Sequence, residues 1–107
     1  MLKKLSLAVL TAVAFAVLTF ADAQTFTGIV SDDHCGAKHS AANDEAATCV
    51  AKCVQGGAKY VLVSSGKIYQ LDAQDKFKDF AGKSVTVKGT LNEGTITVES
   101  VGEAPAQ

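Results

Sequence analysis

The chain has 107 residues, of which 48% are hydrophobic, and it carries 10 Lys against 11 acidic residues. This length accommodates one small domain. The chain contains no Arg and has a net charge of −1, which argues against a nucleic-acid-binding protein because such proteins carry a clustered basic face.

The first 23 residues have the pattern of a secretory signal peptide. Two Lys residues give a positive start, and the apolar run over residues 5–20 is shorter than the roughly 20 residues that span a bilayer. Small residues then form an A-x-A cleavage pattern, so we expect cleavage between Ala23 and Gln24. An uncleaved anchor is the alternative. We expect export to the periplasm or beyond, an oxidising space, with no membrane attachment after cleavage.

The front of the mature chain predicts a strand, a polar loop and a helix. The strand covers Phe26 to Val30, and the loop covers Ser31 to Ser40. The helix covers Ala41 to Val54, where apolar residues recur at helical spacing. Asn43 or Asp44 is placed to cap its start, and the Gly pair at 56 and 57 to end it. Its apolar face comprises Ala46, Cys49, Val50, Cys53 and Val54.

The remainder predicts two hairpins with a short helix between them. A Ser-Ser-Gly turn joins the first pair of strands, and an Asn-Glu-Gly turn joins the second. The elements are strands at Tyr60 to Val63 and Lys67 to Leu71, a helix at Asp72 to Ala81, and strands around Val85 to Val87 and Ile96 to Val98. We expect a single domain over residues 24–101 and a loose tail over residues 102–107.

This order of elements predicts a mainly β fold. Five strands, with a Cys/His-containing helical insert after the first and a short helix between the third and fourth, are the order of a small OB-like barrel. A barrel also removes the exposed edges that five short strands would otherwise present. An open α+β sheet built from the same elements is the alternative.

Five stretches of the chain resemble a family of small secreted bacterial proteins with a domain of unknown function. They are GIVSDDHCGAKH, CVAKC, GAKYVLV, FAGKSVTVKGTL and TITVESV, and the resemblance extends over nearly all of Phe26 to Val101. The resemblance implies an exported OB-like domain with a Cys/His motif near its start, and no assigned activity. It also implies that Cys35, Gly36 and His39 are motif positions, whereas the position of His34 varies.

All three cysteines and both histidines of the chain lie within the 20 residues from His34 to Cys53. Cys35 and His39 form one pair at a spacing of four residues, and Cys49 and Cys53 form another on the predicted helix. A tetrahedral site of three Cys and His39 is chemically reasonable for zinc or copper, with His34 as an alternative ligand. Asp32 or Asp33 is placed to orient a ligating imidazole.

A disulfide is the competing interpretation of the same cysteines. Small exported domains commonly use cross-links for stability, and a bond from Cys35 to Cys49 or Cys53 would close a loop of roughly 15 to 20 residues. One thiol would then remain, either buried or free to form a disulfide-linked dimer. A redox-active thiol is a third possibility, and it requires a lowered pKa.

The sequence shows no complete catalytic set, so we expect a binding or structural module and not an enzyme. Its partner would be a small ligand or a protein that the sequence does not identify. The alternative function is a periplasmic zinc- or copper-binding protein that uses Cys35, His39, Cys49 and Cys53.

Overall fold

The computed structural model describes residues 23–39 and 41–105 of the chain. Residues 1–22 of the predicted signal peptide and the last two residues of the predicted tail lie outside this part. Within the described ranges, the helices are all too short or too polar to traverse a bilayer.

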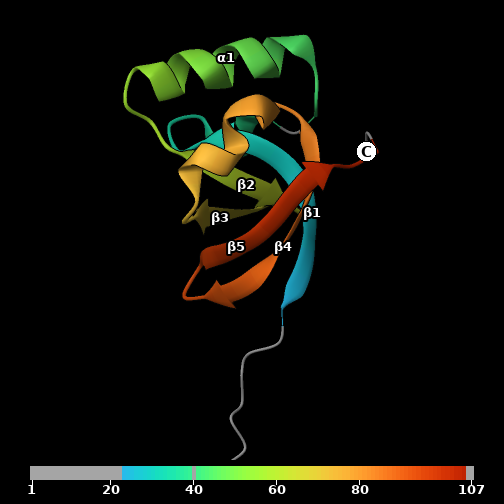
Figure 1. The fold of residues 1–107 in the computed structure, drawn as a ribbon. Coiled ribbons are helices and arrows are strands. Elements are labelled where there is room, and N and C mark those ends of the chain that lie inside the picture. Colours follow the sequence, from blue (N-terminus) through green and yellow to red (C-terminus); the bar gives the residue numbers. More distant parts are fainter. Residues whose placement is uncertain (1–22, 40, 106–107) are drawn as a thin grey trace, which may run out of the picture.

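Five strands form a closed barrel in the order β1-β2-β3-β5-β4 (Figure 1). The strands are β1 (Gln24–Asp32), β2 (Tyr60–Ser64), β3 (Lys67–Leu71), β4 (Ser84–Asn92) and β5 (Thr95–Glu103). All neighbours pair antiparallel except β3 and β5, which are parallel. Ile29 pairs with Val63 on one side and with Ser84 on the other, so β1 has no free edge at this position. The mainly β prediction is confirmed, the open sheet is wrong, and the strand order is compatible with an OB-type barrel.

All strands except β3 continue beyond their predicted ends, and the extensions of β1 and β5 change the predicted loop and tail. β1 reaches Asp32, which pairs with Tyr60, so that the first two residues of the expected loop are still strand. β5 reaches Glu103, which pairs with Val85, past the expected domain boundary at residue 101. In both cases the neighbouring strand extends far enough to supply hydrogen-bond partners for the extra residues. The length over which two strands pair depends on the fold and cannot be read from a single sequence.

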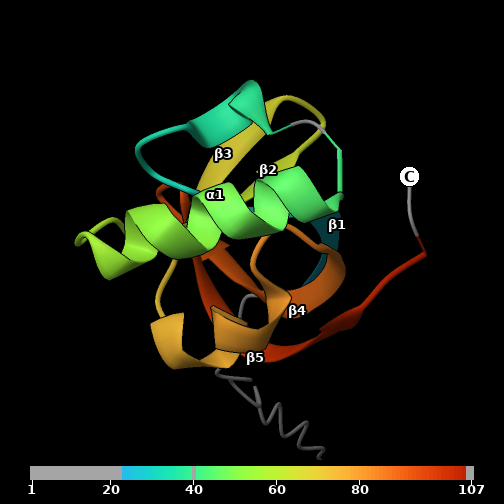
Figure 2. The ribbon, with the colours of Figure 1, turned by 90° about the horizontal axis from the view of Figure 1, so that it is seen from above.

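Helix α1 (Asp44–Gln55) lies across one end of the barrel (Figure 1). The side chain of Asn43 accepts a hydrogen bond from the backbone N–H of Ala46 at 2.7 Å, which caps the first turn as predicted. Seen from above, the helix runs between the short 3₁₀ helices η1 (Gly36–Lys38) and η2 (Gln74–Phe80) (Figure 2).

One hydrophobic core fills the barrel and continues under α1. Val50 of α1 and Phe77 of η2 are completely buried and belong to the same cluster as the inward side chains of the strands. Those strand residues are Phe26, Val30, Tyr60, Leu62, Leu71, Val85, Val87, Ile96 and Val98. Since burial of each such side chain contributes roughly 1.5–3 kcal/mol, packing against the barrel accounts for the fixed position of α1.

Gly82 allows α1 to lie directly against the barrel. It adopts φ +70°, and its N–H donates to the carbonyl of Val30. A Cβ at this position would lie within 2.6 Å of the carbonyl carbon of Ala46 in α1. Only glycine satisfies both the backbone conformation and the close approach.

We predict that Gly82→Ala destabilises the protein more than Gly66→Ala does. Both positions have a similar positive φ, but nothing lies within 4 Å of a Cβ at Gly66. Each substitution should cost roughly 1–2 kcal/mol in backbone strain, and Gly82→Ala should cost roughly 1–3 kcal/mol more through overpacking. Urea unfolding measures both free energies, and equal losses would contradict a tight contact between α1 and the barrel.

Candidate metal centre

The candidate ligands come from two segments that face each other beyond the end of β1. Asp32 is the last residue of β1, Cys35 immediately precedes η1, and His39 immediately follows it. Cys49 and Cys53 lie one turn apart on α1, so both side chains project from the same side of the helix. The site therefore joins the β1–η1 loop to α1.

Asp32 holds the loop in shape from a completely buried position. One carboxylate oxygen, Oδ1, accepts hydrogen bonds from the backbone N–H groups of His34 at 2.9 Å and Cys35 at 2.8 Å. The hydroxyl of Ser31, also completely buried, donates to the carbonyl of Gly36 at 2.8 Å. These three bonds fix the backbone that carries Cys35.

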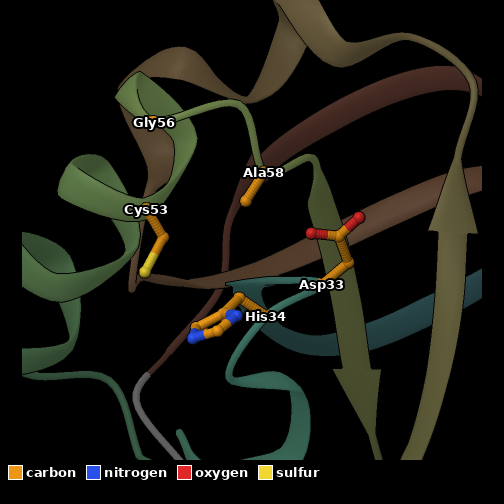
Figure 3. A pocket seen from close by; sticks show the side chains of 5 residues that line it. All are labelled: Asp33, His34, Cys53, Gly56 and Ala58. Atoms are coloured by element: carbon orange, nitrogen blue, oxygen red, sulfur yellow. The ribbon is translucent and has the colours of Figure 1, made fainter.

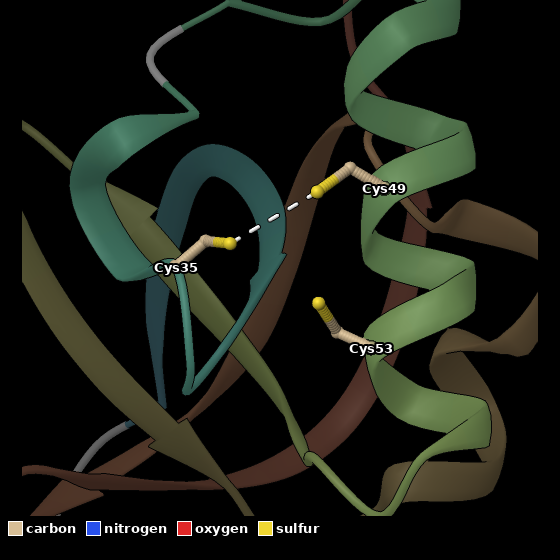
Figure 4. Close-up of side chains that lie close together, drawn as sticks. All are labelled: Cys35, Cys49 and Cys53. Carbon is tan, nitrogen blue, oxygen red and sulfur yellow. Dashed lines mark hydrogen bonds between the residues drawn. The ribbon is translucent and has the colours of Figure 1, made fainter.

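The three thiols converge between the loop and the helix (Figure 4). Cys35 Sγ lies 3.9 Å from Cys49 Sγ, and the Sγ atoms of Cys35, Cys49 and Cys53 all lie within 4.8 Å of one another. All three residues are half-buried, free thiols. Two sulfurs bound to one tetrahedral zinc at about 2.3 Å lie about 3.8 Å apart. The separation of Cys35 and Cys49 therefore suits two ligands of a single ion.

A second group of potential ligands shares Cys35 with the first. Asp32, Cys35 and His39 each offer a ligand atom within 4.8 Å of the others. His39 Nε2 lies 4.0 Å from Asp32 Oδ2, which is too long for a hydrogen bond. Both atoms are buried and have no hydrogen-bond partner among the described residues. Because such groups are costly to bury, this pair indicates a place where a cation would be stabilised.

The surroundings of Cys35 and Cys53 favour the protonated thiols when no metal is bound. Burial, the hydrogen bond with Cys49 and the Asp32 carboxylate raise the pKa of the Cys35 thiol. Burial, followed by the Asp32 carboxylate, raises the pKa of Cys53 to about 11. A redox-active cysteine requires the opposite shift, so these raised pKa values argue against a thiol redox enzyme.

The structure places the five predicted ligand residues in three different locations. Cys35, Cys49 and Cys53 come together, and His39 lies beside Cys35 and Asp32. His34 is exposed and lines a surface hollow next to Cys53. The cluster of Cys35, Cys49, Cys53 and His39 could thus bind a metal, with His34 outside it.

Sequence reasoning assigned too small a role to Asp32. The two adjacent aspartates looked equivalent, but Asp32 is completely buried, whereas Asp33 is exposed. Asp32 brings a carboxylate oxygen within ligand distance of Cys35 and His39, so it is itself a candidate ligand. Asp32 Oδ1 accepts from the N–H groups two and three residues ahead, as in an Asx turn, but Asp33 offers the same spacing, so the sequence does not distinguish the two residues.

A comparison with protein families finds similarity to the family described as "Protein of unknown function (DUF5818)" over residues 54–104. These residues include β2 to β5 and begin directly after Cys53, so the match covers most of the barrel and none of the candidate ligands. No curated protein and no solved structure matches the chain. The resemblance to a family without assigned function is consistent with this match.

We predict slow alkylation of Cys53 in the folded, metal-free protein. With its pKa raised to about 11, Cys53 should react with iodoacetamide at a rate that keeps rising with pH up to that value. Asp32→Asn should shift this profile to lower pH because it removes a negative charge that disfavours the thiolate.

Mass spectrometry of the labelled peptides measures the profile. The same protein in urea is the matched control, since its thiols should titrate near the ordinary value of about 8.5. Labelling of the folded protein that is already complete near pH 7 would contradict the raised pKa.

Proposed function

We propose that the protein binds one thiophilic metal ion, zinc or Cu(I), through Cys35, Cys49 and Cys53. The observation that carries this proposal is the convergence of three thiols from two separate segments, with one pair 3.9 Å apart. Soft thiolates select zinc and Cu(I) over harder cations such as magnesium or calcium. Metal binding releases the thiol protons, so affinity should fall with acidification.

His39 and Asp32 support the proposal from the buried side of the site. A thiolate triad leaves one position of a tetrahedral ion open, and the imidazole of His39 offers a ligand atom within 4.8 Å of that of Cys35. If His39 turns toward the ion, Asp32 Oδ2 is placed to orient the ring. If it does not, Asp32 Oδ2 and His39 Nε2 sit beside the cation and stabilise its charge. In either arrangement the buried polar atoms gain a partner.

The metal would act as a clamp between the barrel and α1. Cys35 belongs to the loop that Asp32 ties to β1, whereas Cys49 and Cys53 belong to the helix. These segments lie close together only in the folded protein, so an ion bound to all three thiolates binds the folded state and not the unfolded chain. Binding free energy then becomes folding free energy, as in other small metal-dependent domains.

A disulfide between Cys35 and Cys49 is the second candidate, and the same 3.9 Å separation favours it over the other pairings. The two sulfurs would have to approach to about 2.05 Å. Cys53 would remain as the odd thiol and could link two copies of the chain. The protein would then be a disulfide-stapled binding or structural module with an unidentified small ligand or protein partner.

We also propose that the protein is exported and begins at Gln24 after cleavage. The signal-peptide pattern ends where β1 begins, and Gln24 already pairs with Gly89 of β4. Cleavage there would leave the barrel intact. A periplasmic or secreted location would expose the thiols to the oxidants that make the disulfide a serious competitor.

We predict that the purified, reduced protein binds one zinc ion per chain and that Cys49→Ser abolishes this binding. Native mass spectrometry gives the stoichiometry, and the denatured mass shows whether the thiols retain their hydrogens. Thr48→Ser is a matched control, since Thr48 is the exposed neighbour of Cys49 on α1.

Two results would contradict the metal proposal. One is a wild-type chain that lacks two hydrogens and binds no zinc, which would establish the disulfide module instead. The other is a fully reduced wild-type chain that binds no zinc.

We predict that the buried pair of Asp32 and His39 changes the affinity for zinc but not the number of zinc ions bound. Asp32→Asn keeps an oxygen for the loop N–H groups but removes the charge at Oδ2. It should weaken zinc binding by about 10–100-fold, as losses of outer-shell partners typically do. Competition with a chelator measures the change. Asp79→Asn, at an exposed aspartate of η2, is the matched control, and an equal effect of both variants would contradict a specific role for Asp32.

We predict that expression with the leader yields a periplasmic or secreted chain whose N-terminal residue is Gln24. Intact mass and N-terminal sequencing of the exported fraction check the cleavage site. Retention of residues 1–23 in a membrane fraction would contradict the export proposal.

A further inference from the structure

A surface hollow of about 490 Å³ opens beside one edge of the thiol cluster (Figure 3). Its lining residues are Asp33, His34, Cys53, Gly56 and Ala58. The sulfur of Cys53 and the imidazole of His34 both project into the hollow, from α1 and from the β1–η1 loop respectively. Its volume lies in the range of sites that accept small molecules, roughly 300–1,000 Å³.

The two sides of the site differ in how exposed the ligand atoms are, although His39 also lines a smaller hollow of about 170 Å³. Toward His39 and Asp32 the ligand atoms are buried, and Asp32 is completely inaccessible. On the side of the hollow, Cys53 lies beside the exposed residues Asp33, His34 and Gly56. Structural zinc sites are closed on all sides, whereas sites that exchange a ligand keep an open position. This asymmetry does not follow from a purely structural clamp.

The rim of the hollow is held in place by hydrogen bonds. The N–H of Asp33 donates to the carbonyl of Lys59 at 2.9 Å, and its carboxylate Oδ1 accepts from the N–H of Lys59 at 3.2 Å. The N–H of His34 donates to Asp32. The backbone that carries His34 is thus anchored to the same buried carboxylate that faces the ligand cluster.

We propose that the hollow is a metal-exchange site in which His34 transfers the ion between the cysteines and a small incoming chelate. The substrate class is a thiophilic transition-metal ion carried by a small ligand, so the ion that clamps α1 to the barrel is also exchangeable cargo. This inference rests on the proposed metal binding by Cys35, Cys49 and Cys53. The exposed carboxylate of Asp33 adds local negative charge that attracts cations to the hollow.

The transfer is a ligand exchange without any change of oxidation state. For release, the imidazole of His34 forms a bond to the ion as the bond to Cys53 breaks, and the freed thiolate takes a proton from water. Donor atoms of the chelate then bind the ion and displace the imidazole and the thiolates of Cys35 and Cys49, which also take protons from water. Loading is the reverse, and the protons of the three thiols return to water.

The test follows zinc transfer between the full purified protein and the chromogenic chelator 4-(2-pyridylazo)resorcinol by stopped-flow absorbance. His34→Ala should slow both loading and removal several-fold and by the same factor, so that equilibrium affinity is preserved. Ala58→Leu, which narrows the hollow without removing a ligand, should also slow both directions. Circular dichroism confirms that each variant is folded.

Ala41→Leu is the matched control. Ala41 is exposed and lines a separate hollow on the side of His39, together with Lys38, Asn43, Glu45 and Ala46. The Ala41→Leu variant should load and release zinc at the same rates as the wild type. Exchange slowed by Ala41→Leu and not by Ala58→Leu would place the route past His39 and overturn the proposal.

Two further results would also overturn it. Unchanged rates in His34→Ala would show that His34 takes no part in transfer, and faster removal with a matching loss of affinity would make it a resident ligand. The failure of the proposed function is a different result, because a wild-type protein that binds no zinc is detected by stoichiometry before any rate is measured.

Discussion

A buried carboxylate, that of Asp32, connects the barrel of this protein to its candidate metal centre. The residue ends β1, is completely inaccessible to solvent, and uses one oxygen to hold the N–H groups of His34 and Cys35. Its other oxygen faces His39 without a hydrogen bond. Burying a carboxylate is expensive unless charge or hydrogen bonds compensate it. A cation held beside Asp32 would supply that compensation, which is why the fold and the proposed function depend on the same residue.

The barrel supplies the rigid frame that makes a shared site possible. β1 lies between β2 and β4, and its last residue, Asp32, pairs with Tyr60 of β2. Val50 and the close approach at Gly82 set the position of α1 over the same end of the barrel. Two cysteines on that helix then meet a third that arrives from the loop. The backbone that carries each sulfur is held by packing or by hydrogen bonds to neighbouring residues: Val50 and Gly82 for α1, and Asp32 for the loop.

Much of the fold was predictable because its signals are local. Alternating apolar residues and Gly-containing turns marked the two hairpins, and β3 has the bounds that the pattern predicted. The helical spacing of Cys49, Val50 and Cys53 identified both the helix and the face it buries. The closeness of Cys35 to these cysteines, and the contrast between Asp32 and Asp33, depend on how α1 and η1 pack against the barrel. The spacing of apolar residues in the sequence does not show how these elements pack. The role of Asp32 and the hollow beside His34 were therefore visible only in the structure.

The central claim is that three cysteine sulfurs bind a single ion between the loop and the helix. X-ray absorption spectroscopy of the zinc-loaded protein tests it most directly, because it identifies the atoms bound to the metal. We expect three sulfur atoms at about 2.3 Å from the zinc ion and one nitrogen or oxygen atom as its fourth ligand. A shell made only of nitrogen and oxygen atoms would contradict it.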